Sequence, residues 1–145
     1  MTRETKLRTI TMTGRAPVRI DETAWPVLAK GIWNDYSGQN EYEANRSWQA
    51  ALRVRQHADG RAIVYATYTA CCGMGVGEYD TRFQGERNLS IRVGLLFAPD
   101  ADLAEAITQV GHLLGQRLAD EDESFPALSS LIAGCIADLP SETLE

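Results

Sequence analysis

Side chains that could act as nucleophiles, bases or metal ligands are few and scattered in this sequence. It holds three cysteines and two histidines: Cys71, Cys72, Cys135, His57 and His112. A thiol nucleophile needs a base or a helix N-terminus that lowers its pKa. His57 is expected at the far end of a hairpin from Cys71 and Cys72, roughly 30 Å away at ~3.3 Å per residue. A structural zinc site needs two close pairs of Cys or His ligands. We therefore predict no thiol enzyme, no metal site and no cofactor.

A glycine-rich stretch, Gly73–Gly77, could expose backbone N–H groups to a phosphate. Phosphate-binding loops, however, need a different glycine spacing or a Gly-Lys-Ser/Thr ending, and a helix must follow. Here Glu78 and Asp80 follow, and their carboxylates repel phosphate. The stretch is therefore predicted to be a flexible connection between strands.

Charge is distributed unevenly along this chain of 145 residues, whose formal net charge is −6. Residues 1–99 carry 13 basic and 10 acidic residues, whereas residues 100–145 carry one basic and 10 acidic residues, a net charge of −9. A surface of one sign attracts partners of the opposite sign and repels phosphates. We predict an acidic surface that occupies a positive groove of another protein; the simpler alternative is a solvated face that keeps the protein soluble. Its residues are Asp100, Asp102, Glu105, Asp120, Glu121, Asp122 and Glu123.

A weaker signal indicates nucleic-acid binding. Arg53 and Arg55 lie on one predicted strand and, with Tyr68 on the next, could form a basic and aromatic sheet face that contacts phosphates and stacks bases. Arg61 and Arg92 could add to it. Arginines on an outer sheet face more often pair with nearby acids, and the whole chain is acidic. A small nucleic-acid-binding regulator is therefore the alternative hypothesis, and a small enzyme with an unrecognised pocket over the sheet is a third.

The elements that would position these residues follow from periodicity. Residues 47–70 hold two strand-like runs around Asp59 and Gly60, which favour a two-residue type I′ turn, so Val54 is predicted to pair with Tyr65. This register places on the core face Trp48, Leu52, Val54, Ile63 and Tyr65. It places on the opposite face Arg53, Arg55, His57, Val64 and Tyr68. Further segments are predicted as strands over 6–13 and 88–97, a short helix or turn over 22–30 and a loop over 34–46.

Beyond Pro99 the apolar residues recur with a helical period. They predict an amphipathic helix over 102–118, capped by Asp102, and a second helix over about 125–138, capped by Ser124. The fold class is therefore predicted to be α+β: an antiparallel sheet of three to five strands with a central hairpin, covered by two C-terminal helices. We expect a single domain over residues 1–145.

The compartment is predicted from what the sequence lacks. No run approaches the ~18 apolar residues of a membrane-spanning helix, and the polar start lacks the apolar region of a signal peptide. An odd number of cysteines is typical of reduced thiols. We predict a cytoplasmic protein.

Three segments together carry a resemblance. They are Thr13–Ile20 (Thr-Gly-Arg-Ala-Pro-Val-Arg-Ile), the hairpin Arg53–Tyr65, and Gln84–Arg87 (Gln-Gly-Glu-Arg). In these the chain resembles uncharacterised small acidic proteins of bacterial conjugative plasmids and integrative elements. The similarity covers most of the chain, to about Pro140, and Cys71–Tyr79 departs from it as an expanded connection. The resemblance brings no catalytic residues. It implies an accessory protein of a mobile element that blunts a host defence, as anti-CRISPR and antirestriction proteins do.

These observations lead to one functional hypothesis. The protein is predicted to be a non-enzymatic binding protein of a mobile genetic element, which inhibits a host defence or nucleic-acid-handling complex through its acidic surface. Its predicted partner is a basic groove of a host protein complex, without direct nucleic-acid or membrane binding. The sequence leaves open whether the protein forms a homodimer.

Overall fold

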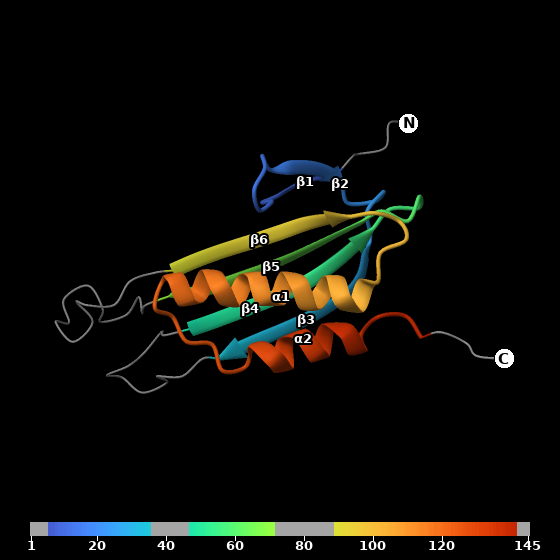
Figure 1. Ribbon diagram of the computed structural model, residues 1–145. Coiled ribbons are helices and arrows are strands. Elements are labelled where there is room, and N and C mark those ends of the chain that lie inside the picture. The colour runs from blue at the N-terminus through green and yellow to red at the C-terminus, as the bar shows by residue number, and fades with distance from the viewer. Residues whose placement is uncertain (1–5, 36–46, 72–88, 142–145) are drawn as a thin grey trace.

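The computed structural model describes residues 6–35, 47–71 and 89–141. Within these ranges six strands are followed by two helices (Figure 1). Their bounds are β1 (Leu7–Ile10), β2 (Val18–Asp21), β3 (Val27–Asp35), β4 (Ser47–Gln56), β5 (Ala62–Cys71), β6 (Leu89–Phe97), α1 (Leu103–Asp120) and α2 (Leu128–Ala137). Strands that precede two C-terminal helices confirm the predicted α+β class.

The main layer is an antiparallel sheet in the order β3-β4-β5-β6, so each strand pairs with its neighbour in sequence. Both helices lie side by side on one face of this sheet (Figure 1). The core between the layers is built from alternate strand residues and the apolar stripe of α1, because side chains alternate across a strand and recur every three to four residues on a helix. Its largest fully buried side chains include Tyr68, Leu52, Ile107, Leu114 and Leu118.

The short β1–β2 hairpin packs against the other face of the sheet. It forms a second, smaller core with residues of the loop before β3 and of β5: Ile10, Met12, Ile20, Trp25, Ile63 and Tyr65. The segment after β1 crosses β6 at Gly94, where the Thr13 N–H donates to the Gly94 carbonyl at 2.8 Å and the Gly94 N–H donates to Thr13 Oγ1 at 3.1 Å. A Cβ at position 94 would lie 2.6 Å from the Thr11 carbonyl oxygen, so this close approach requires glycine.

The β4–β5 turn is one residue longer than predicted, and this changes the register. The His57 N–H donates to the Arg61 carbonyl at 2.9 Å, so three residues form the loop, and Gly60 ends it at a φ of +97°. Val54 therefore pairs with Val64, and the predicted pairing with Tyr65 is wrong. Because a shift of one residue moves every side chain of a strand to the other face, Val64 and Tyr68 face the helices, whereas Ile63 and Tyr65 face the β1–β2 hairpin.

The segment after β2 turns and then extends. The Asp21 carbonyl accepts hydrogen bonds from the N–H groups of Ala24 and Trp25, and its carboxylate accepts one from the Thr23 N–H. Pro26 lacks an N–H and disfavours a helix at this point, and β3 begins at Val27. The turn was predicted, but the alternative of a short helix over 22–30 is wrong.

The helices begin differently from each other. Asp102 caps α1 as predicted, since its carboxylate accepts from the N–H groups of Ala104 and Glu105. The predicted Ser124 cap is wrong, because α2 begins only at Leu128 and its N-terminus has no side-chain cap. Phe125 instead inserts its ring between Trp33 and Tyr68, at centroid distances of 4.7 and 5.3 Å. Of the predicted loop over 34–46, residues 34 and 35 belong to β3 and the rest lie outside the described residues, as does the glycine-rich stretch 73–77.

Candidate anion-binding face

The face of the main sheet opposite the helices is polar and cationic where the β1–β2 hairpin does not cover it. Directly paired residues of an antiparallel sheet share a face, so the register assigns its members. We call these residues the open face: Lys30, Ile32, Asn34, Gln49, Ala51, Arg53, Thr67, Thr69, Ser90 and Arg92. Among the residues that the structure describes, this face holds three cations and no carboxylate.

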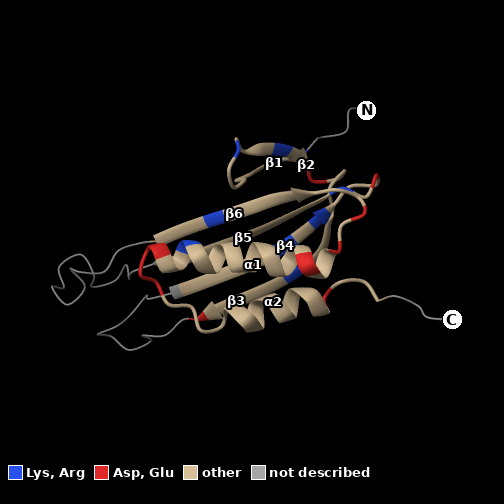
Figure 2. Cartoon of the chain, in the orientation of Figure 1, with Lys and Arg blue, Asp and Glu red and all other residues tan. Residues whose placement is uncertain are grey.

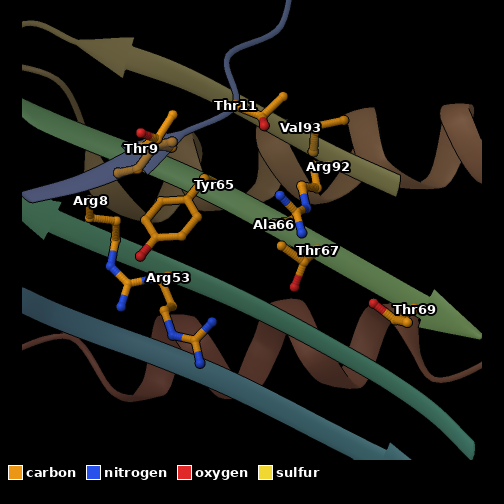
Figure 3. A pocket seen from close by; sticks show the side chains of 11 residues that line it. Arg8, Thr9, Thr11, Arg53, Tyr65, Ala66, Thr67, Thr69, Arg92 and Val93 are labelled. Carbon is orange, nitrogen blue, oxygen red and sulfur yellow. The ribbon is translucent and has the colours of Figure 1, made fainter. Parts of the chain in front are cut away.

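A hollow of about 240 Å³ lies between β1 and the open face (Figure 3). We call it the arginine hollow. Each neighbouring strand contributes polar side chains to it, namely Arg8 from β1, Arg53 from β4, Thr67 and Thr69 from β5, and Arg92 from β6. Its chemistry is therefore that of guanidinium and hydroxyl donors, which bind oxyanions.

Two of the three guanidinium groups have no counter-charge within the described part of the chain. Arg8 donates its Nε–H to the Glu22 carboxylate, and this bond holds the pKa of Glu22 below its usual range. Neither Arg53 nor Arg92 forms an ion pair with a described residue. Arg53 is on β4 and Arg92 is on β6, with β5 between them, and their positions along the strands differ by two residues. At ordinary sheet spacings their Cα atoms are therefore about 12 Å apart. Long side chains at that separation can contact two neighbouring anionic groups.

Arg55, predicted to share the basic sheet face with Arg53, lies in the interior. It is only 7% exposed. Its Nε–H donates to the Tyr65 hydroxyl at 2.8 Å, its Nη1 donates to the Trp25 carbonyl at 3.0 Å, and Glu22 lies 3.8 Å from its Nη2. Arg55 therefore fixes the sheet to the loop before β3 and does not reach a ligand on the open face.

Tyr68, the predicted aromatic member of the basic face, lies on the other side of the sheet. It is 1% exposed beneath the helices, and burial, together with the Glu123 carboxylate beside it, raises its pKa to about 12. Its predicted place beside Arg53 was therefore wrong, for the register reason given above. The same register error placed Thr67 and Arg53 on opposite faces of the predicted hairpin. The hydroxyl groups of the arginine hollow were therefore missed.

The seven residues of the predicted acidic surface form two groups (Figure 2). One group lies at the start of α1 and the other at its end. Because α1 has 18 residues, the groups are ~27 Å apart at 1.5 Å per residue. Asp102 and Glu123 also have structural partners, since Asp102 caps α1 and Glu123 lies beside Tyr68.

The candidate nucleophiles and ligands show no catalytic arrangement among the described residues. Cys135 is buried, its Sγ lies 3.5 Å from the Leu52 carbonyl, and burial raises its pKa to about 11, so the thiol stays protonated. The ring of His57 packs against that of Trp25, with 5.0 Å between the ring centroids, and His112 is exposed on α1.

The described ranges contain no group of three His, Cys, Asp or Glu side chains that could hold a metal ion. None of the described helices is long and apolar enough to cross a membrane.

No family model, curated protein or solved structure matches this chain. The class of the protein is therefore defined by its fold and its site: an α+β protein whose sheet carries helices on one face and, on the other, Arg53 and Arg92, which form no ion pair with a described residue.

Proposed function

We propose that the protein is a non-catalytic nucleic-acid-binding protein that contacts phosphate groups with its open face. One observation carries the proposal: Arg53 and Arg92 lie on the strands to either side of Thr67 without an ion pair to any described residue, on a face without a described carboxylate. Guanidinium groups bind phosphate oxygens through paired hydrogen bonds, and hydroxyl groups add further donors. A neutral or cationic ligand would leave both charges without a counter-charge.

The net charge of −6 is compatible with this proposal because the charges are separated in space. The acidic groups lie at the ends of α1, on the helix side (Figure 2). The strand register places Arg53 and Arg92 on the opposite face of the sheet. A helix is about 10 Å across, and exposed charges more than ~8 Å apart are largely screened at physiological ionic strength. A phosphate on the open face therefore experiences mainly the nearby arginines.

The test is binding to a fluorescently labelled single-stranded oligonucleotide of about 16 nucleotides, a length at the upper end of common site sizes. We expect micromolar affinity at moderate salt, as is usual for contacts with phosphates alone. Arg53→Ala and Arg92→Ala should each weaken binding about tenfold, because each removes charged hydrogen bonds. Arg117→Ala is the matched control, since Arg117 is an exposed arginine on α1 and its loss should change nothing. Absence of binding at low salt, or an equal loss in all three variants, would refute the proposal.

Inhibition of a host complex through the acidic residues stays a second candidate. The observation that favours it is that Asp100, Glu105, Asp120 and Asp122 are exposed, and a basic groove that spans α1 could contact both groups. Its test is to neutralise each end separately, with Asp100→Asn and Glu105→Gln in one variant and Asp120→Asn and Asp122→Asn in another. Both variants should lose association with a purified, positively charged host complex at low salt. Unchanged association in both would exclude this mechanism. The origin in a mobile element and the cytoplasmic location stay predictions.

A further inference from the structure

A second hollow lies beside the same β1–β2 hairpin, with a volume of about 320 Å³. We call it the second hollow. Its apolar lining includes Met12, Ile63 and Leu96, and its polar lining consists of Arg15, Arg19 and Arg61. A depression that combines apolar side chains with a few polar groups is typical of small-ligand sites, whose volumes begin near 300 Å³. This combination differs from the arginine hollow, where hydroxyl groups accompany the arginines.

Arg61 lies over the Trp25 ring in the second hollow. Its guanidinium carbon lies 5.1 Å from the centroid of the Trp25 ring, and its Nε–H donates to the Asp59 carboxylate at 2.8 Å. The backbone N–H of Arg61 donates a second hydrogen bond to the Asp59 carboxylate. This bond is the main reason why the pKa of Asp59 lies below its usual range. The charge of Arg61 is therefore balanced. A balanced guanidinium is a poor ligand for a phosphate, but its planar surface can stack on a flat ring.

Two other arginines of the second hollow have no ion-pair partner in the described part of the chain. Arg15 and Arg19 are exposed, and neither forms an ion pair with a described residue. Leu96 is 42% exposed and lines the same hollow. The hollow thus offers a planar cation and apolar contacts for a ring, with two exposed cations for the charges attached to it. A nucleotide base with its flanking phosphates has this chemistry.

We infer that the second hollow receives an unstacked base, so that the protein prefers single-stranded nucleic acid to duplex. The inference rests on the proposed function and specifies its substrate class. The two hollows are close enough for one strand, because Tyr65 lines the first and Ile63 lines the second, and two residues of β5 span ~7 Å. A duplex keeps its bases stacked, so it has no free base face to insert into the second hollow.

The experiment compares a single-stranded oligothymidylate with a blunt duplex of equal length, at the same salt concentration. We expect the single strand to bind at least tenfold more tightly, since stacking of one base contributes about 1–3 kcal/mol. Leu96→Asp should remove this preference and leave duplex affinity within about twofold. Val27→Asp is the matched control, because Val27 is also 42% exposed on a strand but lines neither hollow. Arg19→Ala, which leaves the apolar lining intact, should weaken single-strand binding alone.

The outcomes separate the inference from the proposed function. If neither probe binds, the proposed function itself fails. If both probes bind equally and Leu96→Asp changes neither affinity, the second hollow takes no base, whereas phosphate contact on the open face stands. An equal loss with both probes in Leu96→Asp would indicate general repulsion and would also overturn base insertion. A thermal melt of each variant verifies that it is folded.

Discussion

The Tyr65 hydroxyl accepts a hydrogen bond from Arg55 Nε at 2.8 Å, inside the molecule. The same guanidinium binds the Trp25 carbonyl, so one buried cation joins β4, β5 and the loop before β3. Arg53 lies two residues earlier on the same strand and points into the arginine hollow (Figure 3). Two arginines that look equivalent in the sequence therefore have different roles, since one supports the sheet and the other is free to bind.

Substitution of these two arginines should separate the roles. Arg55→Ala leaves the Tyr65 hydroxyl and the Trp25 carbonyl without their partner, and we expect it to lower the free energy of unfolding by about 3 kcal/mol. Arg53→Ala should lower it by less than about 1 kcal/mol, because this side chain has no ion-pair partner among the described residues. Urea denaturation measures both values. Equal losses would contradict the assigned roles.

Asp102 should contribute to stability although it belongs to the predicted acidic surface. Its carboxylate accepts from the N–H groups of Ala104 and Glu105 at 3.0 and 3.3 Å. Asp102→Ala should therefore lower the free energy of unfolding by about 1 kcal/mol. Asp100→Ala, two residues earlier and exposed, should change it by less than about 0.5 kcal/mol. If Asp100→Ala proved the more destabilising of the two, the assignment of the cap would be wrong.

Stability should fall in alkaline solution because of Tyr68. Its pKa is raised from 10.0 to about 12 in the folded protein, chiefly by burial. The folded state thus keeps a proton on Tyr68 that the unfolded state releases. The contribution of Tyr68 to the free energy of unfolding is therefore unaffected below pH 10 and falls by about 3 kcal/mol as the pH rises to 12. Cys135, raised from 9.0 to about 11, adds a similar fall that begins near pH 9. Urea denaturation at several pH values, with Tyr68→Phe as the comparison, measures this effect. A fall of equal size in Tyr68→Phe would show that Tyr68 is not its source.

Docking of the β1–β2 hairpin should depend on Gly94. An alanine Cβ there would lie 2.6 Å from the Thr11 carbonyl oxygen, so the chain must shift. We expect Gly94→Ala to cost about 1–3 kcal/mol, the usual effect of overpacking. Gly134→Ala in α2 is the opposite case, because nothing lies within 4 Å of its Cβ position and alanine favours a helix. Thermal unfolding of both variants should therefore shift in opposite directions, and a shift in the same direction would argue against close packing at Gly94.

Strong local patterns predicted most of the fold. The amphipathic period of residues 102–118 and the capping spacing of Asp102 predict α1 to within two residues, and alternation predicts β6. β3 was missed because small residues interrupt its alternation: Gly31 packs against the backbone of α2 at Leu131 and Cys135, where a larger side chain does not fit. That constraint comes from a helix about 100 residues later and leaves no local signal.

The candidate site was harder to predict because it depends on register. Asp59 and Gly60 indicate a turn, but both two-residue and three-residue loops can contain them. Because the loop has a third residue, Tyr68 lies in the core and Thr67 lies on the open face, the reverse of the predicted faces. Arg8 reaches the arginine hollow only because the β1–β2 hairpin folds over the sheet, and this tertiary contact is not encoded by spacing along the strand.

The central claim, that Arg53 and Arg92 bind phosphates, is tested most directly by the salt dependence of oligonucleotide affinity. For single strands, the logarithm of the association constant falls with the logarithm of the salt concentration by about 0.7 per phosphate contacted. The double variant Arg53→Ala, Arg92→Ala should therefore show a slope shallower by about 1.4 than the wild type, whereas Arg117→Ala should keep the wild-type slope. An unchanged slope in the double variant would contradict the account.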